Sequence, residues 1–401
     1  MTTRRNFLVS GAVLATGLGY CYQRGLRYPR LSFEPRALSS NLNQPEAAIT
    51  LADAISLPDL DRLAFRAIAP SPKITLELNT SSLHFSLNNV VKTATLNIQT
   101  SGNSTVEEEV QGITRILSIN GQAGQTIDLQ WHANLDDGLD FAIIGDTGGG
   151  QELDWCLQRA SEIDAQFLLH LGDFNYTDGE YTRAIEQFHQ APLPCYVTIG
   201  NHDFNDSGLV YSHFLRNIGP LNNYFELAGT RFINIDTAAD FFPAQAGLRG
   251  NMLRSLSRTS WHGDNSLLFT HSPLRDPRPM DDHEVGGINE VAWLSDMATK
   301  IDAENLLCGH VHHSAELDIN GLHQWTIGEG LGHEDLIHQQ QVASMLMGRV
   351  EPGRPVDYRW IDLAMPWRFH TSPTHAAKLT RDKRTPQLEW YKSILSSTQP
   401  I

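Results

Sequence analysis

Residues 165–176, AQFLLHLGDFNY, contain the stretch that decides the fold. Their apolar run predicts a buried β-strand over 167–171, and Asp173 follows where that strand ends. Ligands of open α/β sheets collect at the carboxyl ends of the strands, so a carboxylate in this place is a candidate functional group. Tyr176 stands three residues further on. The stretch therefore predicts a strand that carries a carboxylate and a phenol toward one site.

Apolar runs of the same kind recur on both sides of this stretch. They alternate with segments of helical spacing at 151–163, 245–258 and 288–301. This alternation predicts an α/β (α+β) sheet domain over residues 137–365, with one hairpin before the second of these helices and another that closes the domain.

The residues around this domain differ in character. Short alternating runs separated by Asn, Ser and Gly predict a small antiparallel β domain over 71–136. Residues 26–70 contain five prolines and are interpreted as a linker with one short helix near 51–66. Residues 366–401 are polar with scattered aromatic side chains, and we interpret them as a C-terminal tail or a late helix.

The first 25 residues carry a targeting pattern. Arg4-Arg5, then Phe7-Leu8 and a short apolar run, are typical of a twin-arginine export signal. An ordinary secretory signal or a short membrane anchor is the alternative, although the run is short for a spanning helix. We therefore expect the twin-arginine translocase as a partner during export and a periplasmic or other extracytoplasmic location. An uncleaved N-terminus would anchor the protein to the membrane.

Composition restricts the partners. The 401 residues have a formal net charge of −16, which argues against a binder of nucleic acid polymers or anionic membranes. A small phosphorylated substrate stays open, because bound metal ions reverse the local sign of charge. The four cysteines are scattered without a CxxC pair, so no disulfide framework is needed. Cys195 and Cys308 lie in apolar runs and are predicted to be core residues.

Five predicted strands end in residues that can bind metal ions. In chain order these ends read GDTG, GDFNY, GNHD, THSP and GHVHH. The candidate ligands in them are Asp146, Asp173, Tyr176, Asn201, His271, His310 and His312. Carboxylate oxygen and imidazole nitrogen together suit first-row transition metals. The set is too large for one ion but sufficient for two that share a bridging carboxylate, an arrangement that clamps a phosphoryl group and generates hydroxide near neutral pH.

Each motif alone has a simpler explanation. Asp146 could cap the next helix, Asp173 could be a turn residue, and His271 could be a buried, hydrogen-bonded histidine. The presence of all five motifs in this order, each at the end of a strand, favours the metal site over these alternatives.

The motif set resembles that of the calcineurin-like metallophosphoesterases over about residues 139–330. The resemblance implies a two-sheet sandwich flanked by helices. GDTG and GDFNY are similar to the purple acid phosphatases, since Gly148 stands where the phosphodiesterase branch has a histidine. The β-rich segment is similar in placement to the N-terminal β domain of plant-type members. The activity implied is hydrolysis of phosphate monoesters by a metal-bound hydroxide.

The resemblance also implies a role for each candidate residue. A ferric ion would be held by Asp146, Tyr176 and His312, with Asp173 as the bridge. A divalent ion of iron, zinc or manganese would be held by Asn201, His271 and His310. His202 would not bind metal but would face the phosphate, where it stabilises the transition state or protonates the leaving alcohol. Asp203 is expected to orient His202 or to cap the next turn. Alternatively, Tyr176 merely packs over the site or hydrogen-bonds to Asp173.

Two other activities remain open at this point. A phosphodiesterase or nucleotide pyrophosphohydrolase could use the same two-metal site, and a metal-binding module could lack hydrolytic activity. The loop after the fourth motif departs from the family pattern, because His283 is its only histidine and Arg275 and Arg278 are alternative contacts for phosphate. His313 is expected at the surface, and His333 and His338 are expected to be structural.

Overall fold

The computed structural model describes residues 39–58, 63–135, 138–204, 210–238, 245, 247–278, 283–286, 288–331 and 343–363. All of these residues lie in one compact unit, residues 38–401. The expected export signal and C-terminal tail lie outside the described residues, as do His333 and His338. Among the helices within the described ranges, none has the length and apolar character needed to cross a membrane.

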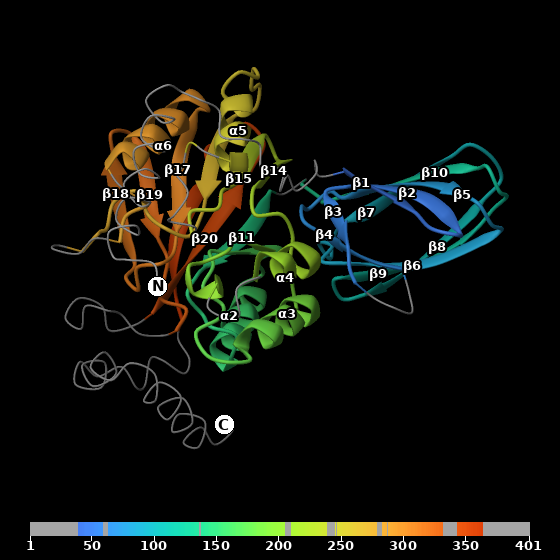
Figure 1. Ribbon diagram of the computed structural model, residues 1–401, viewed down its shortest axis with the longest axis horizontal. Coiled ribbons are helices and arrows are strands. Elements are labelled where there is room, and N and C mark those ends of the chain that lie inside the picture. Colours follow the sequence, from blue (N-terminus) through green and yellow to red (C-terminus); the bar gives the residue numbers. More distant parts are fainter. Residues whose placement is uncertain are drawn as a thin grey trace, which may run out of the picture. The chain divides into compact units, whose positions relative to one another are not determined.

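The N-terminal β domain, residues 39–132, consists of two sheets (Figure 1). The first has the strand order β1-β2-β5-β10-β7 and the second β3-β4-β6-β9-β8. The strands are β1 Ser39–Asn43, β2 Ala47–Ala52, β3 Ala54–Ser56, β4 Leu63–Ala67, β5 Lys73–Leu78, β6 Ser82–Asn88, β7 Thr95–Thr100, β8 Thr105–Gln111, β9 Thr114–Asn120 and β10 Thr126–His132. Alternate residues of these strands point inward and form an apolar core around Trp131.

This domain begins earlier than the sequence predicted. Residues 39–67 form strands β1 to β4, so the predicted linker and the short helix near 51–66 are wrong there. Strand β2 alternates buried and more exposed residues, as a strand with one face on a core does. Pro45, Pro58 and Pro70 lie between strands, where a residue without an amide donor is tolerated. The prolines therefore mark turns of the β domain rather than an extended linker.

The C-terminal domain, residues 139–363, is a second sandwich of two mixed sheets. One sheet, here the β11 sheet, has the order β13-β12-β11-β20-β21, and the other, the β17 sheet, has the order β14-β15-β16-β17-β19-β18. The strands of the β11 sheet are β11 Leu139–Ile144, β12 Phe167–His170, β13 Cys195–Val197, β20 Ser344–Val350 and β21 Asp357–Asp362. Those of the β17 sheet are β14 Asn223–Leu227, β15 Thr230–Asn234, β16 Asn265–Phe269, β17 Ala303–Cys308, β18 Ala315–Ile319 and β19 Leu322–Thr326.

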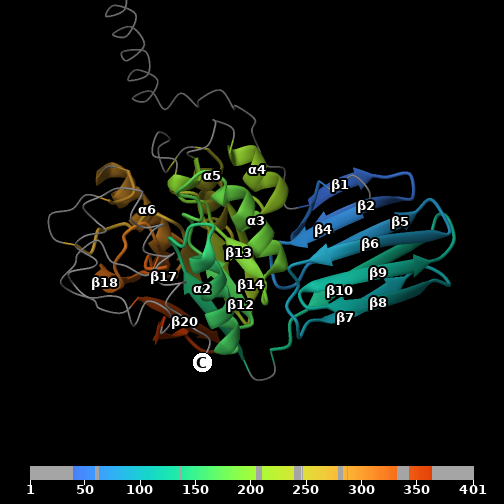
Figure 2. The same cartoon turned by 90° about the horizontal axis from the view of Figure 1, so that it is seen from below.

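Helices cover the outer faces of this sandwich (Figure 2). They are α2 Gln151–Glu162, α3 Glu180–Gln190, α4 Val210–Asn217, α5 Gly247–Leu256 and α6 Ile288–Lys300, with a 3-10 helix η1 at His202–Phe204. Helix α2 contacts β11 and β12, whereas α6 contacts β17 and β19. The predicted two-sheet sandwich flanked by helices is therefore confirmed, together with the hairpins β14–β15 and β20–β21.

Aromatic side chains join the two sheets of the C-terminal domain. The ring of Phe141 on β11 stacks on Phe167 with centroids 5.2 Å apart and meets Phe232 of the other sheet edge-on at 5.2 Å. Cys195 and Cys308 are buried free thiols, as predicted. Strands β11, β12 and β13 run parallel, and so do β15, β16 and β17. The loops at their carboxyl ends carry the candidate ligands.

Candidate metal centre

Each predicted ligand loop leaves the end of a strand. Asp146 follows β11, Asp173 follows β12, Asn201 follows β13, His271 follows β16 and His310 follows β17. Asp146, Asp173 and His310 have positive φ angles of 59°, 58° and 68°. Non-glycine residues rarely adopt this left-handed conformation, and backbone strain of this kind collects at functional sites. The loops are therefore held in sharp turns at the point where the strands end.

The phenol oxygen of Tyr176 lies at the centre of one group of candidate ligands. Its oxygen lies 3.2 Å from Oδ2 of Asp173, 3.4 Å from Oδ1 of Asp146 and 3.2 Å from Nε2 of His312. His312 Nε2 in turn lies 3.6 Å from Asp146 Oδ1. These are the four residues that the sequence assigned to the first metal ion, including the bridge.

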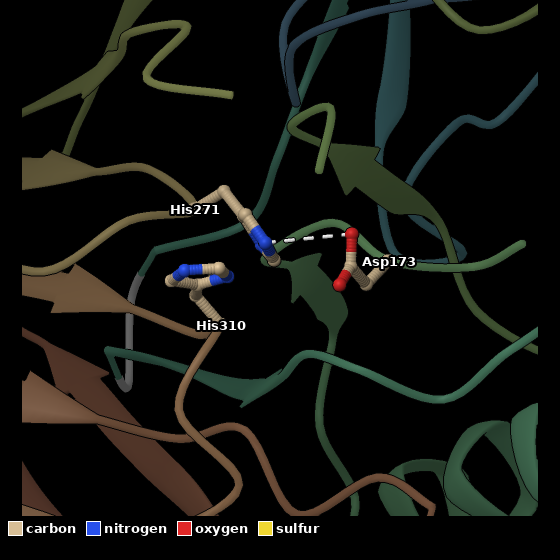
Figure 3. A group of neighbouring side chains, drawn as sticks. All are labelled: Asp173, His271 and His310. Carbon is tan, nitrogen blue, oxygen red and sulfur yellow. Dashed lines mark ion pairs between the residues drawn. The ribbon is translucent and has the colours of Figure 1, made fainter. Parts of the chain in front are cut away.

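A second group of ligands surrounds the other oxygen of Asp173. Nε2 of His271 lies 2.7 Å from Oδ1 of Asn201 and 3.4 Å from Oδ1 of Asp173. Figure 3 shows Asp173, His271 and His310 facing one another, and one ligand atom from each lies within 4.8 Å of the others. Asp173 thus presents one oxygen to Tyr176 and the other to His271, as a bridging carboxylate must.

The donor atoms fit two metal ions. Ligand atoms bound at about 2.0–2.2 Å around one ion lie roughly 3–3.5 Å from one another, close to the spacing around the Tyr176 oxygen. Burial and the neighbouring Asp173 carboxylate raise the pKa of Asp146, because two buried negative charges lie side by side. A cation between the two carboxylates would remove this repulsion. One group of ligands has three oxygen donors and one nitrogen, and the other has two of each, which suits two different ions.

The protein itself fixes the protonation of the ligands when metal is absent. Burial opposes the charged form of His271, but the Asp173 carboxylate outweighs burial and raises the pKa of His271 to about 10. Its Nδ1 donates to the carbonyl oxygen of Leu171 at 2.7 Å, which turns Nε2 toward the site. Burial and the nearby His271 lower the pKa of His310 to about 3. Burial and Asp173 hold the pKa of Tyr176 well above its usual range, so the phenol keeps its proton.

His202 stands beside the metal ligands. Its backbone amide donates to Oδ1 of Asp173 at 2.9 Å, and its ring lies 4.5 Å from the ring of Tyr176 between centroids. The imidazole is partly exposed, in contrast to the buried His271. The role of His202 toward substrate stays a prediction, which its partial exposure beside the ligands allows.

Asp203 binds the backbone of two ligand loops. The buried carboxylate accepts hydrogen bonds from the amides of Gly200 at 2.7 Å, Asp173 at 3.0 Å and Phe174 at 2.9 Å. All three bonds go to the loops that carry Asp173 and Asn201, so Asp203 joins the second and third ligand loops. That Asp203 orients His202 or caps the next turn stays a prediction.

Two further polar side chains support the ligand loops and were missed from the sequence. The amide of Gly172 donates to Nδ1 of His170 at 3.2 Å, so Nε2 carries the proton and donates to Oγ1 of Thr147 at 2.9 Å. This chain joins the first ligand loop to the second. Glu180 accepts from the amides of Tyr176 at 2.6 Å and Thr177 at 3.0 Å. A polar His170 at the end of an otherwise apolar strand was the one available signal.

The loop after the fourth motif reaches the site through His283. Its ring lies 5.2 Å from that of His310, and Nη2 of Arg278 donates to His283 Nδ1 at 2.8 Å. Arg278 is buried and pairs with Asp276 at 3.0 Å, whereas the side chain of Arg275 is exposed. Arg278 thus links Asp276 to His283, and contact of Arg275 or Arg278 with phosphate stays a prediction.

His313 is buried, so its predicted surface exposure is wrong. The turn after His312 folds back, with the amide of His313 donating to the carbonyl of Val311 at 2.7 Å. The next amide, of Ser314, donates to the buried Glu329 carboxylate at 3.3 Å. This turn buries His313 and Ser314. Two adjacent histidines in the sequence did not predict this burial.

Residues 139–314 match the protein family described as Calcineurin-like phosphoesterase. Among solved structures, the chain is similar to the purple acid phosphatase PPD1 from yellow lupin (Lupinus luteus) seeds, with 12% identity, a TM-score of 0.44 and coverage of 74% of this chain and 70% of that chain. It is also similar to a dimetal phosphatase from Danio rerio, with 12% identity, a TM-score of 0.42 and coverage of 57% and 97%.

A third similar structure is an archaeal phosphodiesterase, with 13% identity, a TM-score of 0.32 and coverage of 56% of this chain and 99% of that chain. No curated protein matches the chain in sequence. Residues 139–314 therefore form a calcineurin-like phosphoesterase domain.

Proposed function

We propose that this chain is a phosphomonoesterase of the purple acid phosphatase type. The observation that carries the proposal is the position of the Tyr176 oxygen, within 3.4 Å of Asp146, Asp173 and His312. A deprotonated phenol is a hard, anionic oxygen donor and suits trivalent iron. Gly148 favours the same branch, because it stands where the phosphodiesterase branch has a histidine and its φ of 62° is one that residues with a side chain rarely adopt.

The proposal assigns each ligand to an ion. Asp146, Tyr176, His312 and Asp173 would hold a ferric ion. Asn201, His271, His310 and Asp173 would hold a divalent ion of iron, zinc or manganese. When bound, the two ions would act as Lewis acids on phosphoryl oxygens and make water acidic enough to supply the nucleophile near neutral pH.

Protonation of the leaving group and binding of the phosphate depend on side chains of the protein. In the hydrolysis of a phosphate monoester, a bond forms between phosphorus and the oxygen of water while the bond to the leaving alcohol breaks. The leaving oxygen needs a proton, and His202 is the partly exposed donor beside the site. His283 is a candidate contact for the phosphate, because its ring lies 5.2 Å from that of His310 and its Nδ1 lies 2.8 Å from Nη2 of Arg278.

A paired assay tests this function. Purified full-length protein loaded with iron is given an aryl phosphate monoester and the corresponding bis-ester, and kcat/KM is measured for both. We expect the monoester value to exceed the bis-ester value at least tenfold. A preference for the bis-ester would instead support a phosphodiesterase or nucleotide pyrophosphohydrolase on the same site. A protein that binds two ions and hydrolyses neither would overturn the proposal.

We also propose that the protein is exported by the twin-arginine route, on the evidence of Arg4-Arg5 and the apolar run after them. Replacing Arg4 and Arg5 together by lysine keeps the positive charge and removes the paired arginines. We expect this variant to stay in the cytoplasm, whereas substitution of Arg24 and Arg27 by lysine leaves export unchanged. Fractionation of the cells distinguishes the two, and export of the Arg4-Arg5 variant would refute the proposal.

A further inference from the structure

No residue of the N-terminal β domain, within its described part, belongs to the metal centre. Its contacts with the C-terminal domain are nevertheless specific and polar. The side chains of Arg66, Asn88 and Asn89 lie at this contact, and Arg66 and Asn89 are fully buried. Their partners include both ends of residues 195–218, the segment that carries Asn201 and His202.

Arg66, on strand β4, binds both ends of this segment. Its Nη2 donates to the carbonyl of Cys195 at 2.9 Å, and its Nε donates to the carbonyl of Ile218 at 3.3 Å. Burial lowers the pKa of Arg66 to about 10, so the guanidinium stays charged at neutral pH. The buried guanidinium depends on its hydrogen bonds to these neutral carbonyl groups. Loss of one bond would leave a buried donor without an acceptor, which lowers the free energy of unfolding.

Asn89 completes the hydrogen bonding of strand β13. This strand has three residues and lies at the edge of its sheet, where β12 pairs with one side only. Asn89 Oδ1 accepts from the amide of Cys195 at 2.8 Å, and its Nδ2 donates to the carbonyl of Cys195 at 3.1 Å. The side-chain amide therefore takes the place of a neighbouring strand on the free side of β13.

Asn88 forms a hydrogen bond to a helix next to this segment. Its Nδ2 donates to the carbonyl of His189 at the end of α3 at 3.0 Å, and its Oδ1 accepts from Arg66 at 3.2 Å. His189 Nε2 in turn lies 2.8 Å from the carbonyl of Asn217, the last residue of α4. The β domain thus contacts this segment at its two ends, Cys195 and Ile218.

We infer that the N-terminal β domain is a positioning element for the third ligand loop. Arg66 and Asn89 hold the two ends of residues 195–218 and thereby fix Asn201 and His202 relative to the other ligand loops. The inference rests on the proposed function for the role of Asn201 as a metal ligand. The hydrogen bonds could instead serve stability alone, so the test must separate position from stability.

A matched pair of full-length variants makes this separation. Arg66→Met removes the bonds to Cys195 and Ile218. Arg115→Met removes an equally buried arginine of the same sheet, whose carbonyl acceptors Gly112, Val91 and Lys92 all lie within the β domain. Hydrogen exchange of the metal-free proteins and the affinity for the second ion, measured by competition with a chelator, are compared with the wild type.

We expect Arg66→Met to speed exchange across β13 and α4 and to weaken binding of the second ion about tenfold, the scale of losses at supporting residues of metal sites. Arg115→Met should lower the stability of the protein, but the exchange across β13 and α4 and the affinity for the second ion should stay at the wild-type level. If Arg66→Met does not fold, Asn89→Gly replaces it, because glycine accepts the φ of 69° at this position and removes the side-chain bonds.

Other results would overturn the inference. Equal changes in the two arginine variants, or none in Arg66→Met, would show that the contact serves stability alone. A wild type that binds two ions but does not hydrolyse monoesters would refute the proposed function, while the exchange and affinity data still decide this inference. A wild type that takes up no metal would refute both.

Discussion

Tyr176 and His312 meet although 136 residues separate them in the chain: the phenol oxygen lies 3.2 Å from Nε2 of the imidazole. Tyr176 follows β12 of the β11 sheet, and His312 follows β17 of the other sheet. The contact therefore joins the two halves of the sandwich at the ends of their strands. Two carboxylates, Asp146 and Asp173, complete the group around the same oxygen.

The first prediction concerns Tyr176→Phe. If the phenol binds ferric iron, charge transfer from it gives the iron-loaded wild type a broad visible absorption band. The variant should lose this band and bind the first ion less tightly, while the second ion remains. Absorption spectra and metal content of both proteins provide the measurement.

Tyr181→Phe is the matched control for this experiment. Tyr181 is also buried, five residues further along, and its ring packs on Phe174 rather than among the ligands. The control should keep the band. A colourless wild type with two divalent ions would show that Tyr176 is a wall of the pocket, which would favour the phosphodiesterase.

The ligands could be found from the sequence because each follows a local signal. A buried strand is visible as an apolar run, and the residues at its end, such as Asp173 or His310, stand out by their chemistry. Parallel strands bring their carboxyl ends together whatever the length of chain between them. The structure accordingly brings Asp146, Asp173, Tyr176 and His312 to one point.

The supporting residues carry no such signal. Asp203 and His170 act through hydrogen bonds to backbone amides of loops, and which amides they meet depends on the folded loops. The early strands of the β domain were missed for another reason: Pro45 and Pro58 suggested a linker, but they lie in turns between strands. Proline shows where a strand is interrupted, and cannot show whether strands resume.

The second prediction concerns His202→Ala. Removal of a general acid slows turnover by a factor of about 100 to 10,000, so kcat for a monoester with a poor leaving group should fall in this range. Metal content should stay at the wild-type level, since the hydrogen bond from His202 to the ligand Asp173 comes from its backbone amide, which the substitution keeps. His84→Ala, on the exposed face of the β domain, is the control and should leave both quantities unchanged. A variant that loses metal together with activity would instead make His202 a ligand.

The third prediction follows from the His271–Asp173 pair in the metal-free protein. Burial opposes the charge on His271, but Asp173 raises its pKa to about 10 from an ordinary value of 6.5. A raised pKa stabilises the fold fully below the ordinary value, and this contribution is lost as pH rises toward 10. We expect the unfolding temperature of chelator-treated protein to fall between pH 6.5 and 10, and the slope to be smaller in His271→Gln. Equal slopes in the two proteins would contradict the pairing.

The fourth prediction concerns Asp203→Asn. The carboxylate receives three backbone amides on its two oxygens, and an asparagine would turn an amide group toward at least one of them. A buried amide left without an acceptor costs about 1–3 kcal/mol, so the free energy of unfolding should fall by this amount. The loops of Asp173 and Asn201 would also separate, and binding of both ions should weaken, since Asp173 faces both groups of ligands.

Asp264→Asn provides the comparison for that measurement. Asp264 accepts the amide of Gly353 at 2.8 Å, and it precedes β16 at the end opposite to His271. Its substitution removes a carboxylate that binds backbone, yet leaves the ligand loops untouched. Chemical unfolding and chelator competition on both variants separate the two effects. If metal affinity falls equally in the two, or stays constant in Asp203→Asn, the second and third ligand loops hold their positions without Asp203.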